Sequence, residues 1–368
     1  MRFHLLGLAH THTNRNYMAC AYTQKVLKLA RMLTDLGHEV IHYGGNLSEV
    51  PCEHVTVVSA ADQVKAYGNY DWRSEFFRHD PNDHAYRTFN TNAIREINAR
   101  KRPDDFLLVS FGGYQMPVAQ GVNIPLTVEM GIGYEGVFSQ FRVFESYAWM
   151  HYIYGKLGES ARWYDAVIPN YFDLDDFTLR TNKQDYFAYI GRLVSDKGVQ
   201  IAIDVARELD KPLYIAGQGS LDIFNTKGTK VKHIGTLNAA ERNRFLGAAT
   251  LSFVPTQYIE PFGGVAVEAQ LCGTPVLTTD WGVFPETVLH GVTGYRCRNF
   301  DDFLWAAQHA HELDPRKIRQ WAESNYSMER VGKMYQEYFT KLYDLLDRGW
   351  YARHPDRDRL DWLEKRCP

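Results

Sequence analysis

Apolar and polar positions follow two different patterns along this chain. Residues 2–9 and 38–43 form short, mostly apolar runs, as expected of buried strands, whereas residues 17–36 carry apolar side chains on one helical stripe. A strand, a helix and a strand in this order are typical of a doubly wound domain built on a parallel sheet. Further strands are expected at 105–111 and 124–129, so the pattern continues through the first half of the chain.

The same alternation starts again in the second half. Residues 186–191 and 213–216 are predicted strands, and residues 199–209 between them are a predicted helix. The segment 172–183, which separates the two series, is rich in Asp and Thr and has the composition of a linker. We therefore expect an α/β protein with two domains of ordinary size, each with its own core.

Three further segments extend this picture. Residues 67–83 are dense in Asp, Arg, Asn and aromatic side chains, which fits either a loop over a cleft or a structural insertion. Residues 143–154 are strongly aromatic, and we predict a helix there that packs in the core, with stacking on an acceptor as the alternative. Residues 327–346 predict a long amphipathic helix, which a basic and aromatic tail follows.

The segment 251–280 contains the clearest chemical pattern. An apolar strand leads into a loop with Glu260, and Gly263 and Gly264 then open a helix that carries Glu268. Glycines at a helix N-terminus let a ligand approach backbone N–H groups that lack helical partners, and the helix dipole favours a phosphate there. Carboxylates on either side accept hydrogen bonds from hydroxyls, so the arrangement predicts a nucleotide sugar. The alternative is a solvated helix face with one capping glutamate.

A family resemblance supports the nucleotide-sugar interpretation. The sequence EPFGGVAVEAQLCGTPVL, in which seven residues separate Glu260 from Glu268, resembles the Glu-x7-Glu signature of retaining GT-B glycosyltransferases. It is most similar to glycosyltransferase family 4 (glycosyl transferases group 1). Residues 191–198 (GRLVSDKG) are similar to the diphosphate-binding segment of that family, and residues 167–171 (VIPNY) to its interdomain hinge.

The resemblance implies a GT-B fold, with two Rossmann-like doubly wound domains, an interdomain cleft and a C-terminal crossing helix. Residues 1–175 would form the N-terminal domain on the acceptor side. Residues 176–330 would form the domain that binds the nucleotide sugar. Residues 331–368 would supply the helix that returns to the N-terminal domain, together with the tail.

The resemblance also implies roles for individual residues. Arg192 and Lys197 would neutralise the leaving diphosphate and, with Glu260 beside the donor sugar, would form the catalytic set. The expected donor-binding residues are Glu268, at the ribose hydroxyls, together with Phe262, Gly263, Gly264 and Gly217. Because basic residues take the place of a metal in this family and no Asp-x-Asp is suitably placed, we expect no metal and activity that survives EDTA.

The acceptor side departs from the family pattern. Family 4 enzymes usually carry a histidine that approaches the reacting sugar, at a position where this strand ends in Glu129, and the next histidine here is His151. We therefore expect Glu129 and Tyr134 on the acceptor side, and also His12 from the polar loop that follows the first strand. A turn capped by Glu129 is an equally good interpretation.

Composition and charge limit the classes of partner and the cellular compartment that we expect for this protein. The formal net charge of -3 gives no basic field for a polyanion, although it leaves nucleic acid open. The five cysteines are scattered and form no CxxC, which favours a reducing compartment over a disulfide framework or zinc site. No apolar run reaches the roughly 20 residues that span a bilayer, and Met1 leads into a strand without signal-peptide features. We expect a cytoplasmic protein, with peripheral attachment to a membrane left open.

These expectations combine into one principal hypothesis and three alternatives. The chain is expected to transfer a hexose, with retention, from a UDP- or GDP-linked donor to a hydroxyl acceptor, using no other cofactor. The acceptor would be a glycan, a lipid-linked sugar or a small molecule. The alternatives are transfer to a modified base in DNA, a non-catalytic sugar-nucleotide-binding or scaffold protein, and a GT-B epimerase that needs no acceptor.

Overall fold

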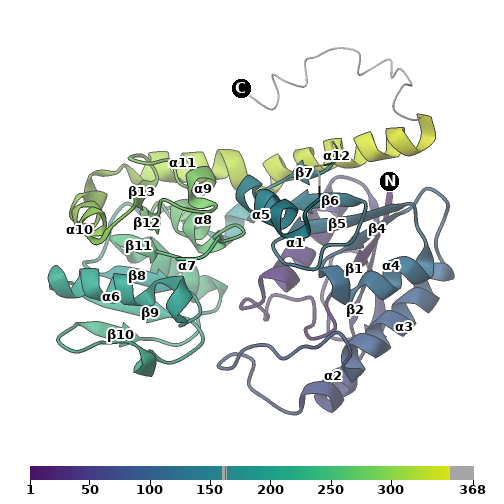
Figure 1. Ribbon diagram of the computed structural model, residues 1–368, viewed down its shortest axis with the longest axis horizontal. Coiled ribbons are helices and arrows are strands. Elements are labelled where there is room, and N and C mark those ends of the chain that lie inside the picture. Colours follow the sequence, from purple (N-terminus) through teal and green to yellow (C-terminus); the bar gives the residue numbers. More distant parts are fainter. Residues whose placement is uncertain (160–161, 163, 349–368) are drawn as a thin grey trace.

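The computed structural model describes residues 1–159, 162 and 164–348, which form two α/β domains (Figure 1). Within these residues, the first domain contains a sheet of seven parallel strands in the order β3-β2-β1-β4-β5-β6-β7. Its strands are β1 (Arg2–Leu6), β2 (Glu39–Gly45), β3 (Glu53–Val58), β4 (Phe106–Val109), β5 (Leu126–Ile132), β6 (Phe141–Phe144) and β7 (Ala166–Val167).

The second domain contains a sheet of six parallel strands, again counted over the described ranges, in the order β10-β9-β8-β11-β12-β13. Its strands are β8 (Phe187–Ile190), β9 (Leu213–Ala216), β10 (Val231–His233), β11 (Leu251–Val254), β12 (Val276–Thr279) and β13 (Gly294–Cys297). Both strand orders reverse direction next to the first strand of the sheet. In open parallel sheets of this kind ligands bind at the carboxyl ends of the strands, near such a reversal.

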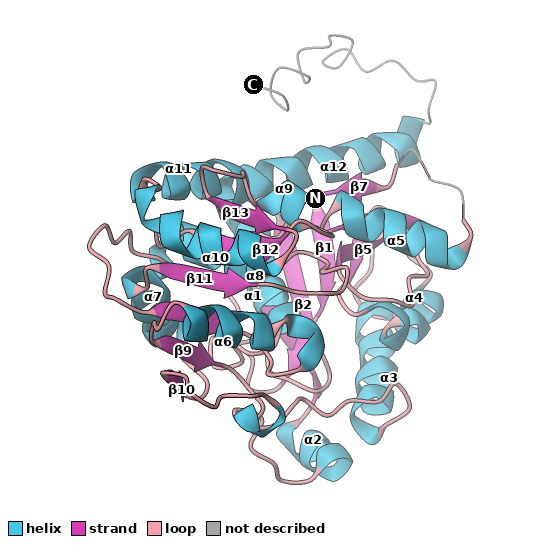
Figure 2. Cartoon of the chain, turned by 60° about the vertical axis from the view of Figure 1, so that its left-hand side comes forward, coloured by secondary structure: helices cyan, strands magenta, loops and turns pink. Residues whose placement is uncertain are grey.

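Helices cover both faces of each sheet, which explains why most strands are uniformly apolar. In the second domain, α6 and α10 lie in front of the sheet in Figure 2. The helices are α1 (Ala21–Asp35), α2 (Ala60–Tyr67), α3 (His84–Asn98), α4 (Met116–Val122), α5 (Tyr147–Leu157), α6 (Val199–Glu208), α7 (Ala239–Ala248), α8 (Gly264–Leu271), α9 (Phe284–Thr287), α10 (Phe300–His309), α11 (Pro315–Tyr326) and α12 (Met328–Arg348).

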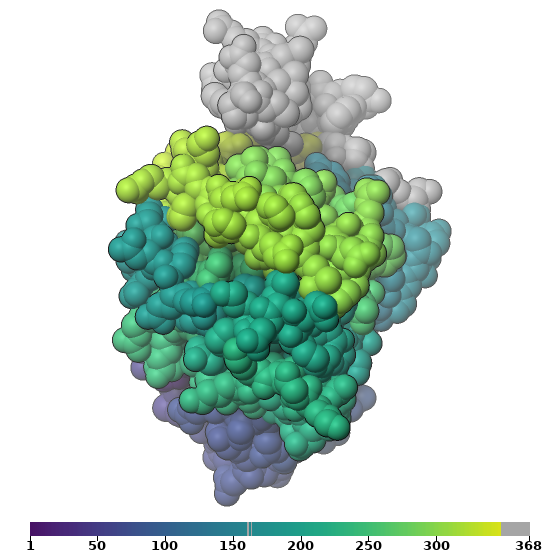
Figure 3. Space-filling view, turned by 90° about the vertical axis from the view of Figure 1, so that its left-hand side faces the viewer, coloured from purple at the N-terminus to yellow at the C-terminus, as the bar shows by residue number. Residues whose placement is uncertain are grey.

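The last helix returns to the first domain. α11 packs on α8 in the second domain, whereas α12 runs across the first domain against α1 and β5 (Figure 1). Phe339 of α12 lies fully buried against Phe3 and Phe106, with ring centroids 4.8 and 5.3 Å away. Figure 3 shows the yellow-green C-terminal helices above the teal and green part of the second domain. The predicted tail beyond residue 348 lies outside the described residues.

Two chain crossings between the domains lie side by side. The linker that leaves the first domain passes the junction of α11 and α12, and the two backbones are hydrogen-bonded there. The N–H of Phe172 donates to the carbonyl of Tyr326 at 2.9 Å, and the N–H of Met328 donates to the carbonyl of Phe172 at 3.1 Å. The domains are therefore joined by a paired crossing rather than by a single strand of chain.

The structure corrects the prediction of one helix over residues 143–154. β6 continues to Phe144, and α5 begins only at Tyr147, where the hydroxyl of Ser146 accepts a hydrogen bond from the N–H of Trp149 at 3.0 Å. The aromatic run therefore contains a strand end, a capping residue and a helix. Apolar periodicity alone does not distinguish a short buried strand from a helix, and the serine cap was the missed signal.

None of the helices in the described part of the chain is both long enough and apolar enough to cross a membrane.

Candidate active site

The N-terminus of α8 forms the centre of the candidate site. Gly263 has a φ of 72°, a left-handed conformation that glycine adopts without strain, and it turns the chain into the helix that starts at Gly264. No side chain caps this end of α8. The first N–H groups of the helix therefore have no side-chain cap, which leaves them able to bind an anion, and the anion site itself stays a prediction.

Lys197 and Glu260 lie beside this helix end. Lys197 belongs to the short turn after β8, and its ammonium forms an ion pair with the carboxylate of Glu260. Glu260 also accepts a hydrogen bond from the hydroxyl of Thr256 at 3.2 Å. These side chains, together with Gly263 and Gly264, line a small pocket of about 70 Å³. The structure thus brings together four of the predicted site residues.

Tyr258 is a member of this group that the sequence prediction missed. The Lys197 ammonium lies 4.9 Å from the centroid of the Tyr258 ring. Burial raises the pKa of Tyr258, and the neighbouring Glu260 carboxylate raises it further, while Arg192 acts in the opposite direction. Tyr258 therefore stays protonated near neutral pH and lies between the exposed Arg192 and Glu260. Its position in the sequence, two residues before Glu260, is the feature that could have identified Tyr258 as a member of the site.

Glu268 has partners of its own, away from the small pocket. It forms an ion pair with Arg242 of α7, with 2.5 Å between the closest atoms. Lys28 of the first domain is close enough that the charge of Glu268 raises its pKa, although burial lowers the pKa of Lys28 overall. The structure therefore places Glu268 on a charged surface that both domains share, rather than in the lining of the pocket at Glu260.

Phe262 and Gly217 serve packing in this structure. The Phe262 side chain is buried against Phe172 and Tyr326, so it faces the interdomain crossing and leaves only its backbone for a ligand. A donor-binding role for Phe262 therefore stays a prediction, which could rest only on its backbone. Gly217 has a φ of 139°, and a Cβ there would lie 1.9 Å from the carbonyl oxygen of Gly191. A glycine is required because the chain after β9 touches the end of β8.

Two of the three predicted acceptor residues, Glu129 and His12, are buried, and Tyr134 is half-buried. Glu129 is 0% exposed, and its carboxylate accepts hydrogen bonds from the N–H groups of Phe138 and Ser139, at 2.9 and 2.7 Å, and from the Tyr134 hydroxyl at 3.2 Å. Glu129 therefore caps a turn and does not face an acceptor, which corrects that expectation. His12 is also buried, and burial lowers its pKa to about 4, so its imidazole is neutral at physiological pH.

Other residues of the first domain lie near Glu260. The pKa of Tyr22 is raised well above its usual value by burial, and the carboxylates of Glu145 and Glu260 contribute to the shift. Tyr22 therefore lies near acidic groups of both domains. Lys25 forms an ion pair with Glu145 and also donates to the carbonyl of Gly131 at 2.8 Å. These residues come from α1 and from the loop after β6, so no single sequence motif connects them.

Two contacts hold the domains together across the cleft. The side-chain amide of Gln218 donates to the backbone carbonyls of Trp72 and Glu75, at 2.8 and 2.7 Å. On another side, the carboxylate of Glu286 accepts from the N–H groups of Tyr147 and Ala148, at 2.9 and 2.8 Å, at the start of α5. The segment that follows α2 therefore reaches the second domain, which favours the interpretation of a loop over the cleft.

Over residues 1–159, 162 and 164–348, no group of three or more His, Cys, Asp or Glu side chains is arranged to hold a metal ion.

Comparisons with known proteins show which sequence family the second half of the chain is similar to. Residues 172–327 match the family model described as "Glycosyl transferases group 1". Glycogen synthase from Mycobacterium tuberculosis (strain CDC 1551 / Oshkosh) is 36% identical over 163 residues, which cover 39% of this chain and 39% of that protein. D-inositol 3-phosphate glycosyltransferase from Mycobacterium sp. (strain KMS) is 34% identical over 174 residues, which cover 41% and 38%. The aligned part thus spans about two-fifths of these curated relatives.

Solved structures match nearly the whole chain. AviGT4, a glycosyltransferase involved in avilamycin A biosynthesis, has a TM-score of 0.69 at 17% identity and covers 93% of this chain and 98% of its own. Sucrose-phosphate synthase from Thermosynechococcus elongatus has a TM-score of 0.70 at 15% identity, with 93% and 99% covered. HepE from Anabaena, solved in complex with UDP and glucose, has a TM-score of 0.66 at 14% identity, with 93% and 100% covered. These comparisons confirm the predicted GT-B fold, and within it residues 172–327 match the glycosyl transferases group 1 model.

Proposed function

We propose that this protein is a retaining glycosyltransferase that moves a hexose from a UDP- or GDP-linked donor to a hydroxyl acceptor without a metal. The observation that carries the proposal is the pairing of Lys197 with Glu260 at the uncapped N-terminus of α8. An uncapped helix end and a lysine suit a diphosphate, and a carboxylate beside them suits sugar hydroxyls. The glycosyltransferase relatives of the second domain support the same reaction class.

On binding, the donor would replace the ion pair between Lys197 and Glu260 in the small pocket with contacts of its own. Lys197 would leave Glu260 for the diphosphate, and Glu260 would then accept hydrogen bonds from the hydroxyls of the donor sugar. Arg192, which is exposed beside the pocket, would bind the same diphosphate as a fork. The pocket has about 70 Å³ in this structure, less than the roughly 300 Å³ of the smallest usual ligand sites, so the residues around it would have to move to admit a whole donor.

The reaction breaks the bond between the sugar and the diphosphate, so negative charge develops on the leaving phosphate oxygen. Fixed N–H donors at Gly263 and Gly264, with Lys197 and Arg192, would stabilise this charge where it forms. Such preorganised donors favour the transition state over the bound donor, which is what raises turnover. The acceptor would enter from the side of Tyr22 and Glu145, and its class is a glycan, a lipid-linked sugar or a small molecule.

The first test is donor binding by thermal shift, with UDP, GDP, ADP and TDP and their common sugar conjugates. A donor at a hundred times its dissociation constant should stabilise the fold by about 2.7 kcal/mol. We expect a shift with one base family, unchanged by EDTA and lost in Arg192→Ala. The matched control is Arg244→Ala, which removes an exposed arginine from α7 outside the site. Equal shifts in both variants, or no shift with any nucleotide, would contradict the proposal.

A further inference from the structure

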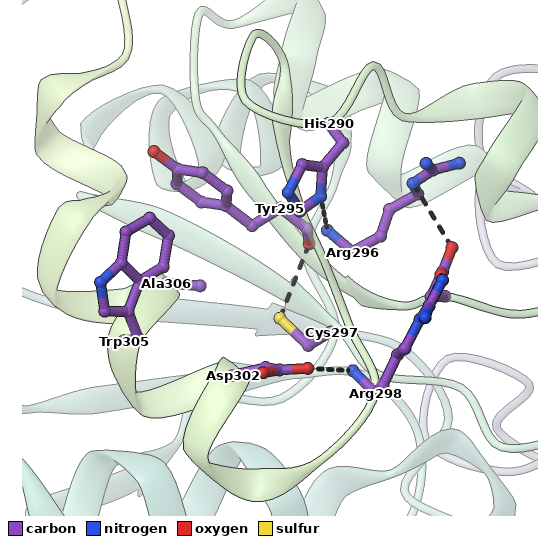
Figure 4. Close-up of a pocket in the computed structure, with 9 residues that line it drawn as sticks. His290, Tyr295, Arg296, Cys297, Arg298, Asp302, Trp305 and Ala306 are labelled. Carbon is purple, nitrogen blue, oxygen red and sulfur yellow. Dashed lines mark hydrogen bonds and ion pairs between the residues drawn. The ribbon is translucent and has the colours of Figure 1, made fainter.

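A second pocket lies in the second domain, between the edge strand β13 and α10 (Figure 4). Its volume is about 400 Å³, within the range of small-molecule sites. None of the residues that line it also lines the small pocket at Lys197. The two cavities are therefore separate sites on the same domain, and the second one has no part in the proposed transfer.

An ordered tryptophan forms one wall of this second pocket. Trp305 is 51% exposed although it is among the largest side chains of the protein. Its ring contacts Tyr295 edge to face, at 5.2 Å between centroids, and stacks on His309 at 4.2 Å. These neighbours hold the ring in place, so a ligand that packs on its open surface does not have to order it first.

Charged groups that neutralise one another form the other wall. Asp280 lies between two arginines, 2.7 Å from Arg298 and 3.5 Å from Arg296. The carboxylate of Asp302 accepts a hydrogen bond from the N–H of Arg298 at 2.8 Å. Two arginines and two aspartates cancel in formal charge. This wall therefore offers both N–H donors and carboxylate acceptors without a net charge that would select an ion.

We propose that the pocket of Trp305 binds a neutral carbohydrate. A sugar ring has a face of C–H groups that packs against an aromatic ring, whose face is electron-rich. Its hydroxyls both donate and accept hydrogen bonds, which matches the mixed wall of Asp280, Arg296 and Arg298. A phosphate would meet two carboxylates there as well as two arginines, and a purely apolar ligand would leave the charged wall without water. The pocket is open along the sheet edge, so it takes one end or a short stretch of a chain.

The proposal does not depend on glycosyl transfer, and its test measures binding alone. The protein is labelled with ¹⁵N on the tryptophan indoles, and the Trp305 signal is assigned by its loss in Trp305→Ala. Maltoheptaose, cellohexaose, mannohexaose and laminarihexaose are then added up to concentrations on the order of 10 mM. We expect at least one of these neutral oligosaccharides to shift the Trp305 indole signal.

Variants separate the pocket from the cleft. In calorimetric titrations the oligosaccharide should bind about tenfold more weakly to Trp305→Ala. Trp281→Ala is the matched control, because Trp281 is similarly exposed, at 49%, and lies outside the lining of this pocket. Asp280→Asn should also weaken binding of the oligosaccharide, because it leaves the two arginines without their shared carboxylate. The nucleotide thermal shift should be the same in Trp305→Ala as in the unchanged protein.

Several results would overturn the proposal. One is an indole signal of Trp305 that none of the four oligosaccharides moves. Another is oligosaccharide binding that survives Trp305→Ala, because the sugar would then bind elsewhere. A third is binding of inorganic pyrophosphate that Arg298→Ala abolishes, because the pocket would then be an anion site. A failed nucleotide thermal shift would leave this proposal standing, so the two proposals fail separately.

Discussion

The two walls of the cleft offer a ligand different things. The second domain presents the uncapped N-terminus of α8 at Gly264, the exposed guanidinium of Arg192 and the ammonium of Lys197. Lys197 is paired with Glu260, which lies in the loop before α8. The first domain presents polar groups that already have partners. Lys25 is paired with a buried carboxylate and with a backbone carbonyl, and the hydroxyl of Tyr22 donates to the carbonyl of Gly133 at 2.7 Å.

This difference indicates how each wall contributes. The N–H groups at the start of α8 have no side-chain cap and Arg192 is exposed, while Lys197 would exchange Glu260 for a bound anion, so the second wall should determine donor affinity and turnover. Groups whose hydrogen bonds are complete stabilise the fold, and removing one of them leaves its partner buried and unsatisfied. Substitutions on the first wall should therefore lower stability, whereas equivalent substitutions on the second wall should lower activity. Four changes test this contrast, from the largest effect to the smallest.

Lys25→Ala tests the first wall. It removes the partner of the buried Glu145 carboxylate, and breaking a buried pair in this way costs about 3–5 kcal/mol of the free energy of unfolding. Chemical denaturation measures the loss. Lys211→Ala, which breaks a surface pair with Asp185, is the control and should change stability by less than about 1 kcal/mol. Similar losses in both variants would contradict a structural role for Lys25.

Lys197→Ala tests the second wall. We expect turnover to fall by about 10²–10³, because the variant lacks the ammonium that would stabilise negative charge on the leaving diphosphate. Steady-state kinetics with the donor found by thermal shift provide the measurement. The free energy of unfolding should fall less than in Lys25→Ala, since the Glu260 side chain is 13% exposed, against 5% for Glu145, and keeps its bond to Thr256. A variant that unfolds but transfers sugar normally would reverse the proposed contrast.

Glu129 predicts a pH dependence of stability that comes from the first domain alone. Burial raises the pKa of Glu129 from 4.5 to about 7 in the folded protein. The folded state therefore holds a proton that the unfolded chain releases, and this contribution to stability is lost as the pH rises from about 4.5 to about 7. The loss is up to about 3 kcal/mol.

The conservative variant isolates this contribution. Glu129→Gln keeps an acceptor for the two N–H groups and does not titrate, so its free energy of unfolding should fall less between pH 5 and pH 7.5 than that of the unchanged protein. Denaturation curves at the two pH values measure the difference. Identical pH dependence in both proteins would show that Glu129 has an ordinary pKa.

Gln218→Ala tests the contact between the walls. It removes two hydrogen bonds to the segment after α2, which together stabilise the closed arrangement by about 1–2 kcal/mol. We expect the KM for the donor to change by about tenfold or less, and trypsin to cut faster at the exposed Arg73 and Arg78. Gln200→Ala, whose amide bonds stay within the second domain, is the control. Unchanged proteolysis would show that Gln218 does not restrain this segment.

Local chemistry explains which parts of the site could be predicted. The anion-binding helix end needs glycines and nearby charges within one strand-loop-helix unit, so Glu260, Gly263 and Gly264 were identified from neighbouring residues. Lys197 came from a motif one strand away, and the structure places it against Glu260. The roles of these residues in catalysis remain predictions, because no ligand contact tests them.

The first wall could not be predicted in the same way. Tyr22, Lys25 and Glu145 come from segments more than a hundred residues apart, and only the fold brings them together. Glu129 was chosen because it ends a strand, yet the same position lets its carboxylate cap the following turn. Position along a strand indicates which end of the sheet a residue reaches, but not whether its side chain has a buried partner.

The paired crossing of the chain constrains how the cleft can open. The linker at Phe172 and the junction before Met328 are hydrogen-bonded backbone to backbone. They therefore form one hinge through which the chain passes twice. A single tether would let the domains drift and turn freely, whereas two adjacent tethers favour a swing about one axis. Each domain also remains in the vicinity of the other at an effective concentration that free partners seldom reach. A change in the angle between the domains would therefore be a rotation about this crossing, with no search for a partner.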